Sequence, residues 1–193
     1  MYITYYFDVN LNIFDKIHIT KIKKKNNKIK KDKISFHGPH SRNVENKNNS
    51  IEKTLNILRN QKIISDFYSI KVFKNIPVFA GLGGGSSNAA TILNFLVKKK
   101  SKRKVVNKVI NHVGSDIRLF FHTQGFLKNF DKVHKLKRNF KLHFVIIYPK
   151  IKCSTKKIFL RVKKFSKKES FSSRFLKDKT IFFKYLELAN NHL

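Results

Sequence analysis

A glycine-rich segment constrains the fold of this chain more than any other feature. Four of the seven glycines lie between Gly81 and Gly85, and two serines follow them directly. The preceding residues 67–73 are mostly aromatic and β-branched, which predicts a strand, and the apolar run after Ser87 predicts a helix. A glycine loop between a strand and a helix N-terminus binds anions well, because its N–H groups can point at a phosphate. The segment therefore predicts a nucleotide site.

Two common phosphate loops do not fit this segment. A Walker loop ends in Gly-Lys-Ser/Thr, whereas residues 85–87 read Gly-Ser-Ser. A dinucleotide fingerprint has an acidic residue about 20 residues further on, where this chain has the basic stretch 98–104. A flexible linker is the alternative for a glycine-rich run, but no polar spacer separates the loop from its flanking elements. If Gly84 were replaced by a larger residue, we expect the new side chain to fill the space that a phosphate needs and to exclude a positive φ.

The composition describes a folded chain with a large excess of positive charge. A hydrophobic share of 41% in 193 residues is sufficient for a core. Lysine and arginine number 43 against 11 acidic residues, which gives a net charge of +32 and points to nucleic acid or an anionic membrane. The basic residues are spread over nearly every segment, however, in a sequence that is rich in Lys, Asn, Ile and Phe throughout. We therefore do not expect nucleic-acid binding as the primary function.

Several other classes of protein are disfavoured. The single cysteine, Cys153, excludes an intrachain disulfide framework, and we interpret it as a bystander. The eight histidines lack the spacing of metal ligands, so no metal site built from protein side chains is expected. The start of the chain does not resemble a signal peptide, and no apolar run reaches the length of a membrane span. We expect a cytoplasmic protein.

Local patterns predict the elements around the loop. Alternating apolar residues predict a strand over 7–13, and further strands near Ile17–Ile19 and 34–36 surround a very basic hairpin at residues 21–33. Gly38-Pro39 predicts a turn. Asn49 and Glu52 form a capping pattern before a helix. After the glycine loop, the sequence patterns predict a helix through Val105 to Ile110 and a buried strand over 142–148. They also predict a linker over 161–179 and a helix over 181–193.

A second motif, His-Val-Gly-Ser-Asp-Ile-Arg-Leu-Phe-Phe, occupies residues 112–121. With it, the chain resembles the galactokinase–homoserine kinase–mevalonate kinase–phosphomevalonate kinase (GHMP) superfamily, and within it the 4-diphosphocytidyl-2-C-methyl-D-erythritol kinases. Residues 77–90 match the ATP motif of that family almost letter for letter, and residues 114–117 match its Gly-Ala/Ser-Asp-Val motif. Residues 148–151 and 154–159 resemble a later strand and the turn after it.

The resemblance implies an α+β protein with the GHMP kinase fold. Residues 1–140 would form an N-terminal, ATP-binding domain of the ribosomal protein S5 domain 2 type, and residues 141–193 the start of a truncated ferredoxin-like C-terminal domain. The implied reaction is ATP-dependent phosphorylation of a hydroxyl of 4-diphosphocytidyl-2-C-methyl-D-erythritol, in the non-mevalonate isoprenoid pathway, with ATP and Mg²⁺. Asp116 would be the catalytic base. The implied ATP-binding residues are Pro77, Val78, Phe79, Ala80, Gly81, Leu82, Gly83, Gly84, Gly85, Ser86 and Ser87.

The chain departs from the family pattern at both ends. The family begins with a Lys-Ile/Val-Asn-Leu strand, whose lysine assists the catalytic aspartate and the phosphates, and with a Gly-Tyr-His segment that holds the cytidine. Neither has a counterpart here: one alignment places Asp8 at the lysine, and the other, which matches residues 12–19 to the second family strand, leaves the first strand absent. The late Gly-x-Gly motif is also missing. Arg118 stands where relatives carry proline or an apolar residue, and Lys16 and Lys74 are candidates to replace the lysine.

Two functions of other classes stay open as alternatives. An inactive fragment or pseudokinase would keep the nucleotide loop and bind ATP without transferring phosphate. A basic nucleic-acid-binding module on the same fold would bind DNA or RNA at physiological salt. The substrate-binding residues and the oligomeric state are not predicted.

Overall fold

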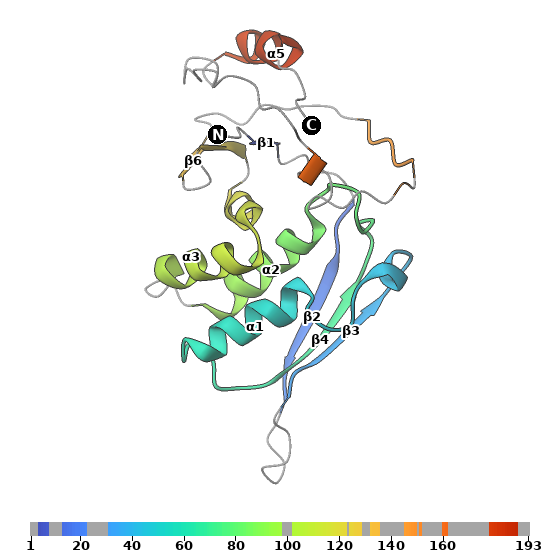
Figure 1. Ribbon diagram of the computed structural model, residues 1–193, viewed down its shortest axis with the longest axis vertical. Coiled ribbons are helices and arrows are strands. Elements are labelled where there is room, and N and C mark those ends of the chain that lie inside the picture. The colour runs from blue at the N-terminus through green and yellow to red at the C-terminus, as the bar shows by residue number, and fades with distance from the viewer. Residues whose placement is uncertain are drawn as a thin grey trace. The chain divides into compact units, whose positions relative to one another are not determined.

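The fold is described from a computed structural model, which covers residues 4–7, 13–22, 31–97, 102–122, 124–128, 132–135, 145–149, 151, 160–161 and 178–188. The chain divides into two compact units. One consists of residues 11–121, and the other combines residues 1–10 with residues 122–193. Both helices and strands occur, so the protein is of the α+β class (Figure 1). The predicted nucleotide loop and the second motif both lie in the unit of residues 11–121.

A three-stranded sheet forms one layer of this unit. Its order is β2 (Lys16–Lys21), β4 (Tyr68–Phe73), β3 (Lys33–His37), with β2 antiparallel and β3 parallel to β4. The predicted strands are confirmed, but the predicted hairpin is wrong, because β4 lies between β2 and β3. The central position goes to β4, whose alternate residues Tyr68, Ile70 and Val72 are all buried.

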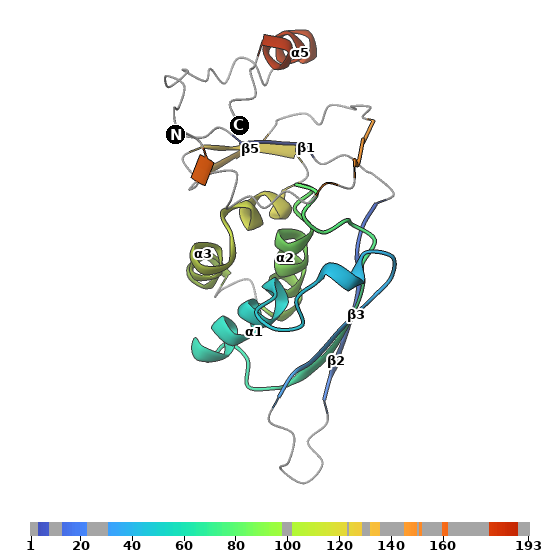
Figure 2. The ribbon, with the colours of Figure 1, turned by 45° about the vertical axis from the view of Figure 1, so that its right-hand side comes forward.

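Helices cover one face of this sheet. These are α1 (Ser50–Asn60), α2 (Gly84–Leu96) and α3 (Lys102–Val113), followed by the 3₁₀ helix η3 (Ser115–Phe121); a shorter 3₁₀ helix, η1 (Ser41–Asn43), follows β3. In Figure 2 the three α-helices lie together on one side of the sheet, so the unit has two layers. The predicted cap of α1 is confirmed, since the Asn49 side chain accepts a hydrogen bond of 3.0 Å from the Glu52 N–H.

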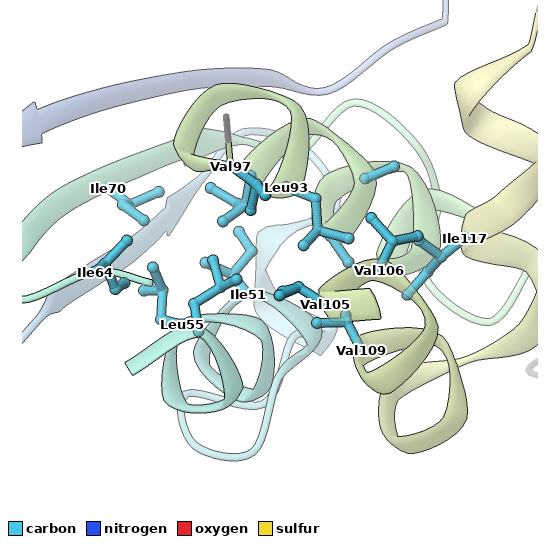
Figure 3. Close-up of a cluster of buried hydrophobic side chains, with 14 of the residues drawn as sticks. Ile51, Leu55, Ile64, Ile70, Leu93, Val97, Val105, Val106, Val109 and Ile117 are labelled. Carbon is cyan, nitrogen blue, oxygen red and sulfur yellow. The ribbon is translucent and has the colours of Figure 1, made fainter. Parts of the chain in front are cut away.

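The core lies between the sheet and the helices. Figure 3 shows side chains of α1, α2 and α3 meeting those of β4 and η3. The predicted stripe of α3 is confirmed, because Val105, Val106, Val109 and Ile110 are all buried. A fully buried side chain of this size contributes about 1.5–3 kcal/mol relative to its exposed state. The core therefore fixes α2, and with it the glycine loop, against the sheet. Its fully buried members include Ile51, Leu55, Leu58, Ile70, Val72, Ile92, Leu93, Val109 and Ile117.

The other unit contains a second antiparallel sheet, with the order β1 (Thr4–Phe7), β5 (Gln124–Lys128), β6 (Lys132–Lys135). Of the strand predicted over 7–13, residues 8–12 lie outside the described residues and Ile13 is not in a strand. The buried strand predicted over 142–148 is not found at its described residues 145–148: Val145 and Ile147 are exposed and belong to no strand.

The C-terminal helix α5 (Lys179–Leu188) begins two residues before its predicted start. The Asp178 carboxylate accepts hydrogen bonds from the N–H groups of Thr180 and Ile181, which caps the first turn. The predicted linker over 161–179 lies mostly outside the described residues, as does the end of the predicted helix at 189–193. Among the helices of the described ranges, none has the length and apolar character needed to cross a membrane.

Candidate nucleotide site

The glycine loop leads directly into α2. The helix begins at Gly84, three residues before the predicted start, and its N-cap is Gly83 with φ of 66°. The Ser87 N–H donates to the Gly83 carbonyl at 2.9 Å and closes the first helical turn. The N–H groups of Gly84, Gly85 and Ser86 therefore lie in the turn that has no intrahelical partners. Glycine at the N-cap permits the left-handed backbone that turns the chain into the helix.

This helix N-terminus differs from two others in the protein. The first turn of α1 is capped by Asn49, and that of α5 by Asp178. The first turn of α2 has neither a side-chain cap nor an acidic residue. Its positive partial charge is left uncompensated by an N-cap side chain or a first-turn carboxylate, which is the arrangement that favours a bound anion.

The buried carboxylate of Asp15 anchors the loop from behind. It accepts hydrogen bonds from the Lys74 ammonium at 2.5 Å, from the N–H groups of Asn75 and Ile76 at 2.9 Å each, and from the Asn88 side chain at 3.0 Å. These donors come from the end of β4, from the entrance of the loop and from α2. One carboxylate thus joins the start of β2 to both sides of the glycine loop.

The Asp15–Lys74 pair is almost completely removed from water, with 2% and 5% of the two side chains exposed. Each buried charge requires the other, because an unpaired ion in the interior costs several kcal/mol. The backbone of Lys74 is fixed as well, since its N–H donates to the His37 carbonyl and its carbonyl accepts from the His40 N–H. At Gly38, with φ of 95°, a Cβ would stand 2.8 Å from the Lys74 carbonyl oxygen.

Gly84 faces this anchor, which corrects the expected reason for a glycine at this position. A Cβ at Gly84 would stand 3.1 Å from Ile76 Cγ2 and 3.2 Å from Lys74 Nζ. A larger residue would therefore push against the anchor rather than fill the space of a phosphate. Within the loop, the positive φ angles belong to Phe79, Gly81 and Gly83 instead, at 62°, 73° and 66°.

The second motif packs against the glycine loop. A Cβ at Gly114 would stand 3.6 Å from Ser86 Oγ, and one at Gly83 only 2.8 Å from the Phe120 ring. Both glycines thus permit a close approach between η3 and the start of α2. Asp116 lies in the first turn of η3, is exposed, and accepts a hydrogen bond of 3.2 Å from the Ser115 hydroxyl. The structure brings the two predicted motifs together.

The predicted loop residues differ in their surroundings. Phe79 is 43% exposed and has φ of 62°, a left-handed conformation that bulky residues rarely adopt. Gly81 has nothing within 4 Å of the position of a Cβ. Pro77, Val78, Ala80 and Leu82 are all half-buried, and Ser87 begins the hydrogen-bonded part of α2.

Sequence reasoning missed Asp15 and Asn88 as parts of this site, and it treated Lys74 only as a replacement for another lysine. The structure distinguishes the two replacement candidates. Lys74 is buried and its Nζ lies near Gly84, whereas Lys16 is exposed on β2 with its ammonium 6.0 Å from the centre of the Phe14 ring. A signal for Asp15 was present in the sequence: it is one of only 11 acidic residues, in a lysine-rich region.

Residues 49–122 match the family described as GHMP kinases N terminal domain. This range contains α1, β4, the glycine loop, α2, α3 and η3, and hence both motifs. The chain carries a GHMP kinase N-terminal domain. The match confirms the predicted superfamily on the residues that carry the two motifs.

The chain is a homologue of the 4-diphosphocytidyl-2-C-methyl-D-erythritol kinases. It is 37% identical over 188 residues to the kinase of that name from Pelagibacter ubique, an alignment that covers 95% of this chain and 64% of the relative. It is 31% identical over 156 residues to the one from Ureaplasma parvum, covering 77% and 55%, and 34% identical over 127 residues to the one from a Sulfurihydrogenibium species, covering 63% and 46%. The chain therefore spans between about half and two thirds of the length of these relatives.

Proposed function

We propose that this chain supplies the nucleotide site and the catalytic base of a 4-diphosphocytidyl-2-C-methyl-D-erythritol kinase. The reaction transfers the terminal phosphoryl group of ATP to a hydroxyl of the cytidine-diphosphate-linked methylerythritol. The similarity to kinases that are named for this substrate supports it. The observation that carries the proposal is the close approach of Gly114 to Ser86, which sets the Asp116 segment beside the uncapped N-terminus of α2.

In this proposal the loop residues Pro77 to Ser87 bind the phosphates of ATP. The N–H groups in the first turn of α2 donate to phosphate oxygens and stabilise the charge that develops during transfer. Asp116 accepts the proton of the attacking hydroxyl as the new oxygen–phosphorus bond forms and ADP leaves. Its exposed position leaves the carboxylate open to a substrate, as a base requires.

Magnesium would enter this site together with ATP. The described residues include no group of three or more His, Cys, Asp or Glu side chains that could hold a metal ion. Mg²⁺ usually keeps several waters and takes only one or two protein carboxylates beside the substrate phosphates. The N–H groups of the loop would hold the phosphate oxygens. The Mg²⁺ would be held by the phosphates of ATP and by water, and Asp116 is left free to accept the proton.

We further propose the finer fold assignment implied by the family. The two-layer unit of residues 11–121 is consistent with a ribosomal protein S5 domain 2 type of domain. The domain division at residues 140 and 141, and a ferredoxin-like C-terminal part, stay predictions.

Asp116→Asn tests the proposed base. Asparagine keeps the shape but cannot accept the proton, so we expect kcat to fall by about 10²-fold or more while ATP affinity changes less than a few-fold. Phosphoryl transfer to the cytidine-diphosphate-linked substrate is measured by ADP release, and ATP affinity by calorimetry. Ser115→Ala is the matched control, because it removes the hydroxyl next to Asp116 and leaves the carboxylate. Wild-type turnover in the Asp116→Asn protein would exclude Asp116 as the base.

The same two measurements separate the kinase from the pseudokinase. Binding of ATP by the wild-type chain with no detectable ADP release in the presence of substrate would favour the pseudokinase. Failure to bind ATP at all would contradict both interpretations of the glycine loop.

A further inference from the structure

The sheet of β2, β4 and β3 has a second face, opposite the helices. Figures 1 and 2 show α1, α2 and α3 on one side of this sheet only. The inward side chains, such as Ile19, Ile70 and Ile34, are paired in register and face the core. The alternate residues point the other way. We call their surface the outer face; its members are Lys16, His18, Thr20, Lys33, Ser35, His37, Ser69, Lys71 and Phe73.

The outer face carries positive charge without any acidic residue. Its three lysines, Lys16, Lys33 and Lys71, are exposed, and none of them forms an ion pair within the described part of the chain. Two carboxylates are direct sequence neighbours of these lysines, and both already have a cation: Asp15 is paired with Lys74, and Asp32 with Arg59 at 2.8 Å. Elsewhere on the same sheet Lys21 is paired with Asp66. The outer face is therefore a concentration of uncompensated cations, which fits a polyanion.

Two aromatic rings stand exposed among these cations. Phe73 is 46% exposed, and it is the direct cross-strand partner of Lys16. Phe14 is 52% exposed, and the Lys16 ammonium lies 6.0 Å from the centre of its ring. Lys71 lies two residues before Phe73 on the same face of β4. Exposed phenylalanine is costly in water, so a ligand with flat apolar rings would gain by covering it.

We propose that the outer face binds single-stranded nucleic acid. Unpaired bases stack on exposed aromatic rings while lysines bind the phosphates between them, and this combination is tolerant of sequence. In duplex DNA or RNA the bases are stacked inside and cannot reach rings on a flat sheet. The inference does not depend on the kinase function, because the outer face and the glycine loop use different residues.

Stacking is tested with a fluorescein-labelled single-stranded oligouridylate of about 12 nucleotides, whose binding to the full 193-residue chain is followed by fluorescence anisotropy. Phe73→Ala is expected to weaken binding at least about 5-fold, the equivalent of about 1 kcal/mol of stacking. The matched control is Phe95→Ala, which removes a 64% exposed ring from α2. Equal effects of the two variants would overturn the proposal.

The contribution of charge to binding is tested by replacing two lysines of the outer face. The double variant Lys16→Gln, Lys71→Gln should reduce the slope of log K against log salt by about 1.4, or about 0.7 for each phosphate that is no longer neutralised. The control Lys53→Gln, Lys104→Gln removes the same charge from exposed positions on α1 and α3. The same change in both double variants, or binding of a duplex of equal length as tightly as the single strand, would show a non-specific polycation and overturn the proposal.

Discussion

The carboxylate of Asp15 and the ammonium of Lys74 form an ion pair across 59 residues of sequence, with 5% or less of either side chain exposed. The pair is asymmetric. Asp15 accepts hydrogen bonds from three further donors, on Asn75, Ile76 and Asn88. The Lys74 side chain, in contrast, donates to Asp15 alone among the hydrogen bonds found between described residues. Its two members should therefore respond differently to mutation.

Asp15→Ala should lower the free energy of unfolding by about 3–5 kcal/mol, because it leaves a buried ammonium and two loop N–H groups without their acceptor. Lys74→Met should cost at least about 1 kcal/mol less, since three donors still satisfy the carboxylate. Urea unfolding followed by circular dichroism measures both. Asp66→Asn is the control: its pair with Lys21 lies at the surface, with 63% of the lysine and 30% of the aspartate side chain exposed, and little change is expected. Equal destabilisation by Asp15→Ala and Lys74→Met would contradict the asymmetry.

Gly83→Ala and Gly81→Ala separate backbone strain from the contact between loop and second motif. Both glycines have a positive φ, so alanine at either position should cost about 1 kcal/mol. Only at Gly83 would the new Cβ also meet the Phe120 ring, at 2.8 Å. We expect Gly83→Ala to cost about 1 kcal/mol more than Gly81→Ala and to weaken ATP binding more strongly in calorimetry.

A second substitution tests whether the Phe120 ring causes the extra destabilisation of Gly83→Ala. Adding Phe120→Leu to Gly83→Ala should recover part of the extra destabilisation, since a smaller side chain can move away from the new methyl group. If the double variant loses as much free energy of unfolding as the two single variants lose together, Phe120 is not the obstacle.

Phe79→Gly should raise the stability of the protein by about 0.5–1 kcal/mol. Phe79 has φ of 62° and a ring that is 43% exposed, so glycine would relieve the backbone and remove little packing. The neighbouring Ala80→Gly is the control, because Ala80 is not among the residues with positive φ and should lose about 0.4–1 kcal/mol. The midpoint of urea unfolding is the measurement, and a destabilised Phe79→Gly protein would refute the argument.

Stability should fall as the pH rises above about 10. Burial raises the pKa of Tyr68 above its ordinary value of 10.0, and the nearby Asp66 carboxylate raises it further. In this range the unfolded chain has lost the phenolic proton while the folded chain still holds it, so unfolding is favoured. The hydrogen bond to Asp66 raises the pKa of Lys21 above 10.5, which acts in the same direction. Tyr68→Phe should make the decline in urea midpoint at pH values above the ordinary tyrosine pKa of 10.0 shallower; an unchanged decline would exclude Tyr68 as a cause.

Local patterns predicted the local elements well. The cap of α1 and the apolar stripe of α3 depend on residues three or four positions apart, and both are confirmed. The start of α2 was placed three residues late, because glycines are poor helix formers and only the tertiary environment shows that Gly84 to Ser86 form its first turn. Val145 and Ile147 were expected in a buried strand and are exposed, since an apolar run does not say what will cover it.

Long-range pairing was the part that the sequence did not predict. The position of β4 between β2 and β3 follows from the competition of three apolar strands for the centre of the sheet, which no single strand reveals. The Asp15 anchor is of the same kind, because its donors lie 59 to 73 residues away. The glycine loop and the Gly-Ser-Asp segment were identifiable as motifs, whereas their close approach at Gly114 and Ser86 required the fold.

The separation between Asp15 and its donors also bears on how the site is assembled. A chain made from its N-terminus exposes the Asp15 carboxylate long before Lys74 and Asn88 exist. The loop can acquire its final shape only after β2, β4 and α2 have come together, whereas α1 needs only neighbouring residues for its cap. Nucleotide binding should therefore be among the last properties to appear during refolding, and its recovery time would report completion of the whole two-layer unit.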